Sequence, residues 1–404
     1  MNRGQALWTT DYRPGQYVAI KDAAINFPRT STKGFQRWLL DILTITPEES
    51  LRFFEGITTI WDKFTSCFAP LDALQSYEPI ARQVIRRLLR DIQSDGIRWV
   101  EFRTVLGLPY FREGSETPVE SSENFFLQMW SEELESFRTS ADGHDFWGCR
   151  FIMTCLRAWD RKTIVRNMKL CITAKLMYPD LVCGFDCVGF EVAGRSLADL
   201  TPELFWFKKK CAEATVDIPF FLHAGECLGD GDEADQNLFD ALLLGTRRIG
   251  HAFSLYKHPL LVEMVKTKKV LVECCPISNE ILRLNSDIKA HTLPALLARG
   301  VACSLSNDDP AVLGYGSSGV THDFWQALQG WENLGLEGLG SLAENSVRWA
   351  AFTDQSAQDW RRDVSAGKHG HNLRAERMRE WFDEWDNFCA EIVSEYGIDY
   401  GGDL

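Results

Sequence analysis

The chain has 404 residues, of which 45% are hydrophobic and 25% are charged, a composition typical of a globular protein and unlike that of disordered, collagen-like or disulfide-rich chains. Its 43 Lys and Arg against 57 Asp and Glu give a net charge of −14, which argues against nucleic acid or an anionic membrane as the main partner, because both bind basic surfaces. No run approaches the ~18 apolar residues of a membrane span, and the first residues lack the apolar core of a signal peptide. We therefore expect a cytoplasmic protein from the chain as written, or an extracellular one if a signal peptide precedes it.

The first part of the chain, residues 1–96, is predicted to be a helical segment that packs on the rest. Between residues 77 and 92 apolar side chains recur three and four positions apart, the spacing of one face of a helix. Gly96 then stands where a glycine commonly ends a helix.

Seven short apolar runs follow, separated by segments long enough for crossover helices. They cover residues 97–103, 150–156, 182–189, 218–223, 248–253, 269–275 and 301–306. Runs that are nearly all apolar, rather than alternating, indicate parallel strands buried on both faces. Repeated βα units of this number favour a TIM-type (β/α)8 barrel over residues 97–355, and no glycine-rich dinucleotide-binding motif follows any strand.

Residues 356–404 are predicted to form a C-terminal helical extension of the same structural domain. Its last segment carries one apolar stripe, made of Met378, Trp381, Trp385, Phe388, Ile392 and Tyr396. We expect this helix to close the outside of the barrel, and the alternative is that its Trp-rich face forms a homodimer contact.

Polar side chains stand where successive predicted strands end. His223 and Glu226 follow one strand, His251 ends the next, and the adjacent pair Asp308 and Asp309 follows the last. In a parallel barrel these ends meet at one mouth, where active sites lie. Two adjacent carboxylates repel each other unless a cation or a proton donor lies between them, so we expect a metal ion.

Four ordered motifs carry a resemblance to a known family. They are His-Ala-Gly-Glu at 223–226, Arg-Ile-Gly-His at 248–251, Cys-Pro-Ile-Ser-Asn at 275–279 and Ser-Asn-Asp-Asp-Pro at 306–310. Together they resemble the adenosine/AMP deaminase branch of the metal-dependent amidohydrolases. Looser strings at 60–64, 99–103 and 184–189 are similar to the adenosine deaminase-related growth factors, and the likeness covers roughly residues 10 to 395.

The resemblance implies hydrolytic deamination of adenosine or 2'-deoxyadenosine to inosine and ammonia, with one Zn²⁺ ion as cofactor. It implies that His223 and Asp308 are zinc ligands and that Glu226 is the proton donor. It also implies that His251 orients the attacking water and helps to deprotonate it.

The same resemblance implies three substrate contacts. Asp309 would hydrogen-bond the purine N7, Gly189 would contact the purine through its backbone, and Glu101 would be a strand-end carboxylate that holds the ribose. The expected partner is a small nucleoside.

One departure from the family pattern concerns the metal. The family's first barrel strand ends in His-x-His, whereas this chain has no histidine before His144. We expect that strand to lie upstream of Met1, the barrel to be open beside residues 97–103, and zinc binding to be weak, since catalytic zinc usually has about three protein ligands. The one His-x-His present, His369 to His371, is expected to lie in a solvated loop.

Two other functions remain open. The chain could be a catalytically silent nucleoside-binding or signalling protein that has lost its metal. It could instead deaminate AMP or adenine, and AMP would require cationic phosphate ligands, for which Arg283 and Lys289 are candidates.

Overall fold

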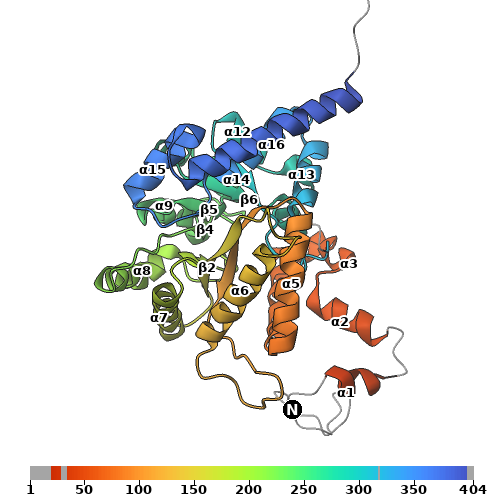
Figure 1. The fold of residues 1–404 in the computed structure, drawn as a ribbon. Helices are drawn as coiled ribbons and strands as arrows, with labels where there is room; N and C mark the ends of the chain where they lie inside the picture. Colours follow the sequence, from red (N-terminus) through yellow and green to blue (C-terminus); the bar gives the residue numbers. More distant parts are fainter. Residues whose placement is uncertain (1–19, 29–33, 317–318, 398–404) are drawn as a thin grey trace, which may run out of the picture.

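The computed structural model describes residues 20–28, 34–316 and 319–397 and shows an α/β barrel surrounded by helices (Figure 1). Its seven strands are β1 (Trp99–Val105), β2 (Gly148–Leu156), β3 (Val182–Val188), β4 (Leu222–Ala224), β5 (Arg248–His251), β6 (Leu271–Cys274) and β7 (Cys303–Leu305). All pairs are parallel, in the orders β1-β2-β3 and β4-β5-β6-β7, and a parallel bridge between Phe185 and Phe220 joins the two groups. The seven predicted parallel strands and the α/β barrel class are thus confirmed.

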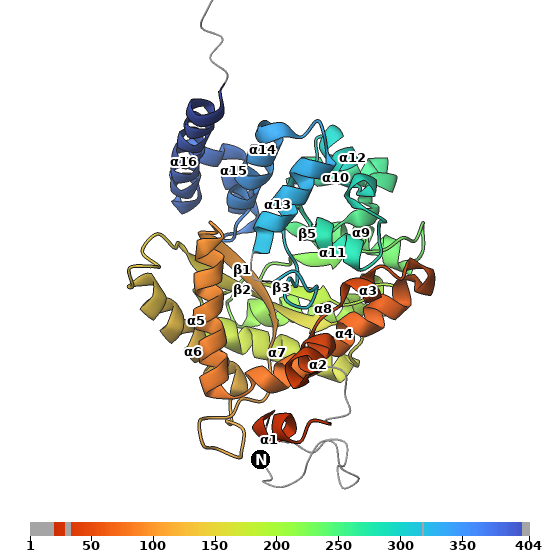
Figure 2. The same ribbon diagram turned by 90° about the vertical axis from the view of Figure 1, so that its right-hand side faces the viewer.

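The strand order leaves one opening. Within the described ranges no pairing joins β7 to β1, which agrees with the opening expected beside residues 97–103. Figure 2 shows the strands in the centre and the helices around them.

Helices precede the strands, connect them and follow them. Before β1 lie α1 (Ile20–Ile25), α2 (Phe35–Leu43), α3 (Pro47–Ser50), η1 (Phe53–Glu55), α4 (Gly56–Gln75) and α5 (Glu78–Ser94). Between the strands lie α6 (Ser122–Arg138), α7 (Arg161–Met177), α8 (Leu197–Glu213), α9 (Glu233–Leu243), η2 (Phe253–Lys257), α10 (Pro259–Lys268), α11 (Pro276–Ile281), η3 (Ile288–Ala290) and α12 (Leu293–Ala298). After β7 come α13 (Gly319–Gly330), α14 (Gly335–Arg348), α15 (Ala357–Ala366), η4 (Gly367–His369) and α16 (Leu373–Tyr396).

The predicted helix over residues 77–92 is confirmed as α5. Its buried side chains are Ala81, Ile85, Leu89 and Ile92, and Gly96, with a φ of +81°, follows the end of the helix. The apolar face is narrower than predicted, because Ile80 is 41% exposed.

The N-terminal helix α4 packs over one end of the barrel. Its buried residues Ile60, Trp61 and Phe64 share an apolar cluster with Phe253 after β5 and Leu313 after β7. Trp61 also stacks on Phe190, which follows β3, with ring centroids 4.9 Å apart. Loops that follow strands lie at the carboxyl end of a barrel, so α4 covers the mouth in which active sites occur.

A chain of ion pairs fills the inside of the barrel. Arg103 donates to Asp186 at 2.8 Å and to Glu273 at 2.7 Å, and Arg248 donates to Glu273 at 2.5 Å and to Glu101. Each of the three carboxylates therefore contacts at least one of the two guanidinium groups, and buried charges are tolerated when they are paired in this way.

This chain of ion pairs corrects the position of Glu101. Glu101 is the third of seven residues in β1, and it pairs with Arg248, the first residue of β5. It also accepts hydrogen bonds from the backbone N–H of Ala351 and from the Trp99 indole. Glu101 is thus not a strand-end carboxylate and does not lie at the mouth.

The last helix differs in part from the prediction. Its buried residues are Arg374, Ala375 and Met378, all in its first two turns, whereas Phe388, Val393 and Tyr396 are 43%, 68% and 68% exposed. The second half projects beyond the other elements in Figures 1 and 2. The stripe therefore packs on the protein only in part: Trp381 and Trp385 are half-buried, and Trp385 lies against Gly340 of α14, whereas the last two turns of the helix are exposed.

Two further facts concern the described residues. All twelve cysteines are free thiols, and Cys389 alone among them is not buried. None of the helices in the described ranges combines the length and apolar character that a membrane-spanning segment needs.

Candidate active site

Two imidazoles meet at the carboxyl ends of neighbouring strands. His223 lies in β4 and His251 ends β5, and their ring centroids are 4.9 Å apart. The strand register pairs His223 with Gly250, and a Cβ atom at position 250 would lie 2.9 Å from His223 Nδ1. A glycine at position 250 therefore leaves the room that the His223 ring occupies.

Asp308, which follows β7, reaches the same place. Its Oδ2 accepts a hydrogen bond from Ser278 Oγ at 2.7 Å and lies 3.9 Å from His251 Nε2. His251 and Asp308 both have positive φ angles, 63° and 56°. Such backbone strain in residues other than glycine clusters at functional sites.

Glu226 is a buried carboxyl group beside these residues. It is 2% exposed, its Oε1 has no hydrogen-bond partner, and that atom lies 3.5 Å from His251 Nδ1. Burial, followed by the neighbouring Asp308 and Glu191 carboxylates, raises the pKa of Glu226 well above its usual range. The group is therefore held as a neutral acid that can donate a proton.

Glu191 fixes the loop that carries this acid. Its carboxylate accepts hydrogen bonds from the backbone N–H groups of Gly225, at 3.2 Å, and Glu226, at 3.0 Å. Gly189, two residues earlier, directly follows β3 and has a φ of +96°. Gly189 therefore lies at the same end of the barrel as Glu226.

Asp309 adds a second carboxyl group with a perturbed proton affinity. Burial and the adjacent Asp308 raise the pKa of Asp309 well above its usual range. An adjacent pair of this kind favours one protonated and one ionised group, because two ionised carboxylates at short range repel each other.

His251 is a neutral imidazole. Burial lowers its pKa to about 4, against the opposing effect of Asp308. Its Nδ1 lies 3.2 Å from Asn279 Nδ2.

His223 is held by a fully buried carboxylate on the neighbouring strand. Asp186 of β3 contacts His223 Nδ1 at 2.5 Å and also accepts a hydrogen bond from Arg103. Burial alone would raise the pKa of Asp186, but His223 and Arg103 outweigh it and hold that pKa well below its usual range. An ionised carboxylate on one nitrogen leaves Nε2 of His223 available as a ligand, an arrangement common among metal-binding histidines.

The residues at the mouth fit a metal ion. Possible ligand atoms of His251, Cys275 and Asp308 all lie within 4.8 Å of one another. Burial and the nearby Asp308 raise the pKa of the Cys275 thiol well above its usual range. Imidazole nitrogen and carboxylate oxygen are donors that zinc accepts.

The structure brings together His223, Glu226, His251 and Asp308 and places Asp309 and Gly189 at the same end of the barrel, whereas Glu101 lies apart from them. Sequence reasoning missed Asp186 and Glu191 as parts of the site, and also His291, whose Nε2 lies 2.9 Å from Asn279 Oδ1. The one available signal for Asp186 was a carboxylate inside an otherwise apolar strand.

Two regions named in the sequence do not belong to the site. Arg283 donates to the backbone carbonyl groups of Ser50, Gly56 and Glu49, so it anchors the N-terminal helices. His369 and His371 are exposed and lie before α16, where a loop was predicted.

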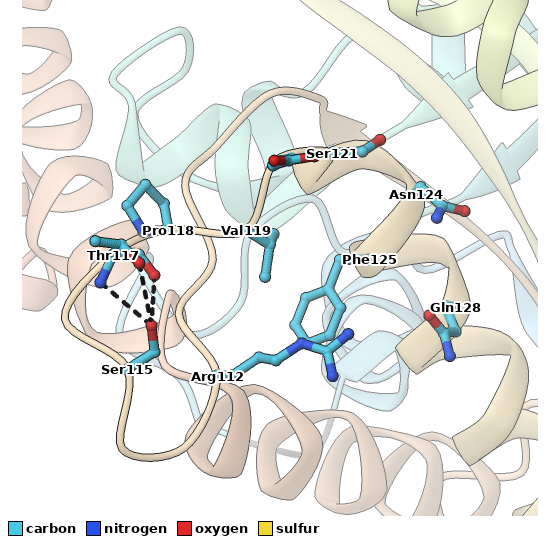
Figure 3. Close-up of a pocket in the computed structure, with 10 residues that line it drawn as sticks. Arg112, Ser115, Thr117, Pro118, Val119, Ser121, Asn124, Phe125 and Gln128 are labelled. Carbon is cyan, nitrogen blue, oxygen red and sulfur yellow. Dashed lines mark hydrogen bonds between the residues drawn. The ribbon is translucent and has the colours of Figure 1, made fainter.

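A hollow in the β1–α6 loop is separate from the catalytic cluster. Figure 3 shows its lining, in which Arg112 lies over the ring of Phe125, with 5.1 Å between guanidinium carbon and ring centroid. None of the predicted site residues lines it.

Comparisons with known proteins agree with the motifs. A family model for adenosine deaminase matches residues 44–366. Adenosine deaminase 2-A of Danio rerio is 33% identical over 324 residues, covering 78% of this chain and 61% of that protein. Adenosine deaminase 2 of Sus scrofa is 31% identical over 361 residues, covering 89% of this chain and 65% of that protein. The chain therefore spans less than two thirds of the length of these relatives.

Solved structures share the fold. An adenine deaminase from Arthrobacter aurescens has a TM-score of 0.57 and 20% identity, covering 82% of this chain and 97% of that one. An amidohydrolase from Burkhoderia ambifaria with bound Zn has a TM-score of 0.56 and 17% identity, covering 80% of each chain.

Proposed function

The chain belongs to the adenosine deaminase family, in the branch of the adenosine deaminase-related growth factors, and from this premise we propose that it hydrolyses adenosine or 2'-deoxyadenosine to the corresponding inosine and ammonia. The observation that carries the proposal is the buried carboxyl group of Glu226 beside His251, whose Oε1 has no hydrogen-bond partner and whose pKa burial raises well above its usual range. Protonation of a purine ring nitrogen requires such an acid, and burial supplies it at neutral pH.

We assign the metal site to His223 and Asp308, with zinc as the ion. When bound, zinc would lower the pKa of a water molecule from about 15.7 to about 7 and so make a nucleophile available at neutral pH. Asp186 supports this assignment because it keeps His223 oriented with Nε2 free. Ser278 also supports it, because its hydroxyl group donates a hydrogen bond to Oδ2 of Asp308 and so orients that carboxylate.

The chain's own groups then handle the protons. The water oxygen adds to C6 of the purine as Glu226 gives its proton to N1, and the C6–N6 bond breaks. One proton of the water leaves with ammonia and the other restores Glu226, so that adenosine and water become inosine and ammonia. His251 orients the water, since its ring lies between Glu226 and Asp308.

Two further residues position the purine. Asp309, kept protonated, can donate to N7, which is an acceptor only. The backbone of Gly189 is open, since no atom lies within 4 Å of the place where its Cβ would be. Glu101 has no part in this site, because Arg248 and the Ala351 N–H already occupy its carboxylate.

The hydrogen bonds of Arg283 favour a nucleoside over AMP as the substrate. This cation was considered as a phosphate ligand, yet its guanidinium is committed to three backbone carbonyl groups. A phosphate would have to displace bonds that hold the N-terminal helices.

Ammonia release from adenosine, deoxyadenosine, adenine and AMP tests the proposal, with protein assayed before and after incubation with zinc. We expect release from the two nucleosides, increased by zinc, and at least tenfold lower kcat/KM for adenine and AMP. Adenosine binding without ammonia release at any zinc concentration would contradict it and would favour a silent nucleoside-binding protein. Release from AMP alone would move the assignment to a nucleotide deaminase.

A further inference from the structure

A line of hydrogen bonds leads from the backbone of α12 to the catalytic imidazole. The N–H of Leu293, the first residue of α12, donates to His291 Nδ1 at 3.0 Å. His291 Nε2 lies 2.9 Å from Asn279 Oδ1, and Asn279 Nδ2 lies 3.2 Å from His251 Nδ1. Three side chains thus connect the helix start to the active site.

The direction of every bond in this line follows from its first member. A backbone N–H can only donate, so His291 Nδ1 accepts and carries no proton. Burial lowers the pKa of His291 to about 3, so the ring is neutral and its one proton is on Nε2. That proton can be donated only to the oxygen of Asn279, which turns the Asn279 amide nitrogen toward His251.

The hydrogen bond between Asn279 and His251 then determines which ring nitrogen of His251 carries the proton. An amide NH₂ can only donate, so His251 Nδ1 accepts and is unprotonated. The ring proton is therefore on Nε2, the nitrogen that lies 3.9 Å from Asp308 Oδ2. Glu226 Oε1 is at 3.5 Å from Nδ1, farther than the Asn279 amide, and as a neutral acid it can donate to the same nitrogen.

We propose that Asn279 and His291 are positioning residues that fix His251 as the Nε2–H tautomer. The three side chains are 0%, 6% and 3% exposed, so water does not compete for their polar atoms. The His291 ring also packs against Phe253 and Trp331, with centroid distances of 5.5 and 5.9 Å. A flip of this ring would break two hydrogen bonds inside a packed cluster.

The fixed tautomer specifies how His251 acts, on the basis of the proposed function. A neutral imidazole with its proton on Nε2 donates toward the mouth and cannot accept a proton there. His251 therefore orients the attacking water by donating a hydrogen bond to it. The deprotonating role implied by the family resemblance does not suit this tautomer.

The substitution Asn279→Asp reverses the direction of the hydrogen bond to His251 with almost no change in side-chain shape. A carboxylate accepts from both neighbours, so it would accept the His291 Nε2 proton and draw the His251 proton to Nδ1. His291→Gln is the conservative rescue, because its amide can still donate to Asn279 Oδ1. Asn285→Asp is the matched control: Asn285 is also buried, and its Nδ2 donates to the Asp287 carbonyl rather than to an imidazole.

The direct measurement is ¹⁵N NMR of the histidine rings in the full chain as purified, with His251→Gln used to assign the signals. We expect the Nε2–H pattern for His251 in the wild type, in His291→Gln and in Asn285→Asp, and the Nδ1–H pattern in Asn279→Asp. We also expect kcat for adenosine to fall by about 100-fold to 10,000-fold in Asn279→Asp, as in other wrong-tautomer variants, with KM changed less than threefold.

An Nδ1–H pattern in the wild type would overturn the proposal, whatever the activity. An Nε2–H pattern that persists in Asn279→Asp would overturn the role of Asn279. If the wild type has the expected tautomer but releases no ammonia, the positioning role of Asn279 and His291 is supported and the proposed function fails. The two failures are therefore distinguishable.

Discussion

Asp186 holds His223 by two hydrogen bonds, one from the backbone N–H at 2.8 Å and one at ring Nδ1, 2.5 Å away. Because Asp186 is ionised and fully buried, it fixes the proton of the His223 ring on Nδ1 and leaves the Nε2 lone pair facing the mouth. Carboxylates that support a metal-binding imidazole in this way strengthen both its orientation and its basicity.

We therefore predict that Asp186→Asn weakens zinc binding about 10-fold to 100-fold, the usual effect of losing such a support. Titration against a chromophoric chelator measures the affinity without any dependence on activity. Glu191→Gln is the matched control, since Glu191 is an equally buried carboxylate at the same mouth that bonds backbone N–H groups of the acid loop. Equal zinc affinity in Asp186→Asn and the wild type would refute this role.

For Glu226→Gln we predict that kcat for adenosine falls about 100-fold to 10,000-fold, the range for loss of a general acid. Stability should not fall, because Glu226 is already neutral in the folded protein and an amide has the same shape. Steady-state kinetics and a thermal melt of the same preparation check both parts. A variant that retains more than a tenth of wild-type kcat would show that the proton comes from another group.

Much of the site could be predicted because each residue ends an apolar run. His223, His251 and Asp308 stand at the boundary between buried strand and polar loop, and parallel strands bring such boundaries together. Asp186 could not be assigned in this way, since nothing in the sequence shows that an isolated carboxylate in β3 faces a histidine in β4.

The errors in the predicted position of Glu101 and in the predicted packing of α16 have related causes. The strand pattern gives the face on which Glu101 lies but not its height along the barrel axis, which depends on the stagger of the strands and on Arg248. The apolar stripe of α16 predicts a helix correctly, but it cannot show how much of that helix packs against the rest of the protein.

Glu101 gives a third prediction, on stability rather than catalysis. Glu101→Gln leaves the buried Arg248 with one fewer carboxylate and should lower the free energy of unfolding by about 3–5 kcal/mol, the usual effect of breaking a buried pair. Urea unfolding measures this, and KM for adenosine should be unchanged. Glu337→Gln, at an exposed position on α14, is the control and should change stability by less than about 0.5 kcal/mol. An unchanged stability with a raised KM would restore the ribose-binding role.

The last prediction concerns pH and the carboxyl group of Asp323 on α13. Asp323 is fully buried, its Oδ1 accepts a hydrogen bond from the Ile277 N–H at 3.2 Å, and its Oδ2 has no partner. Burial is the main cause that raises its pKa from 3.8 to about 8. Between these two values the folded state holds a proton that the unfolded state has released, so the stability of the fold decreases as the pH rises from about 4 to about 8 and changes no further above that.

Asp323→Asn removes this dependence and keeps an acceptor for Ile277. We predict that the stability advantage of the variant over the wild type is larger at pH 9 than at pH 5, by on the order of a few kcal/mol. Asp230→Asn, at an exposed loop position, should follow the wild type at both pH values. If the stability advantage of Asp323→Asn is no larger at pH 9 than at pH 5, then Asp323 is not held as a neutral acid.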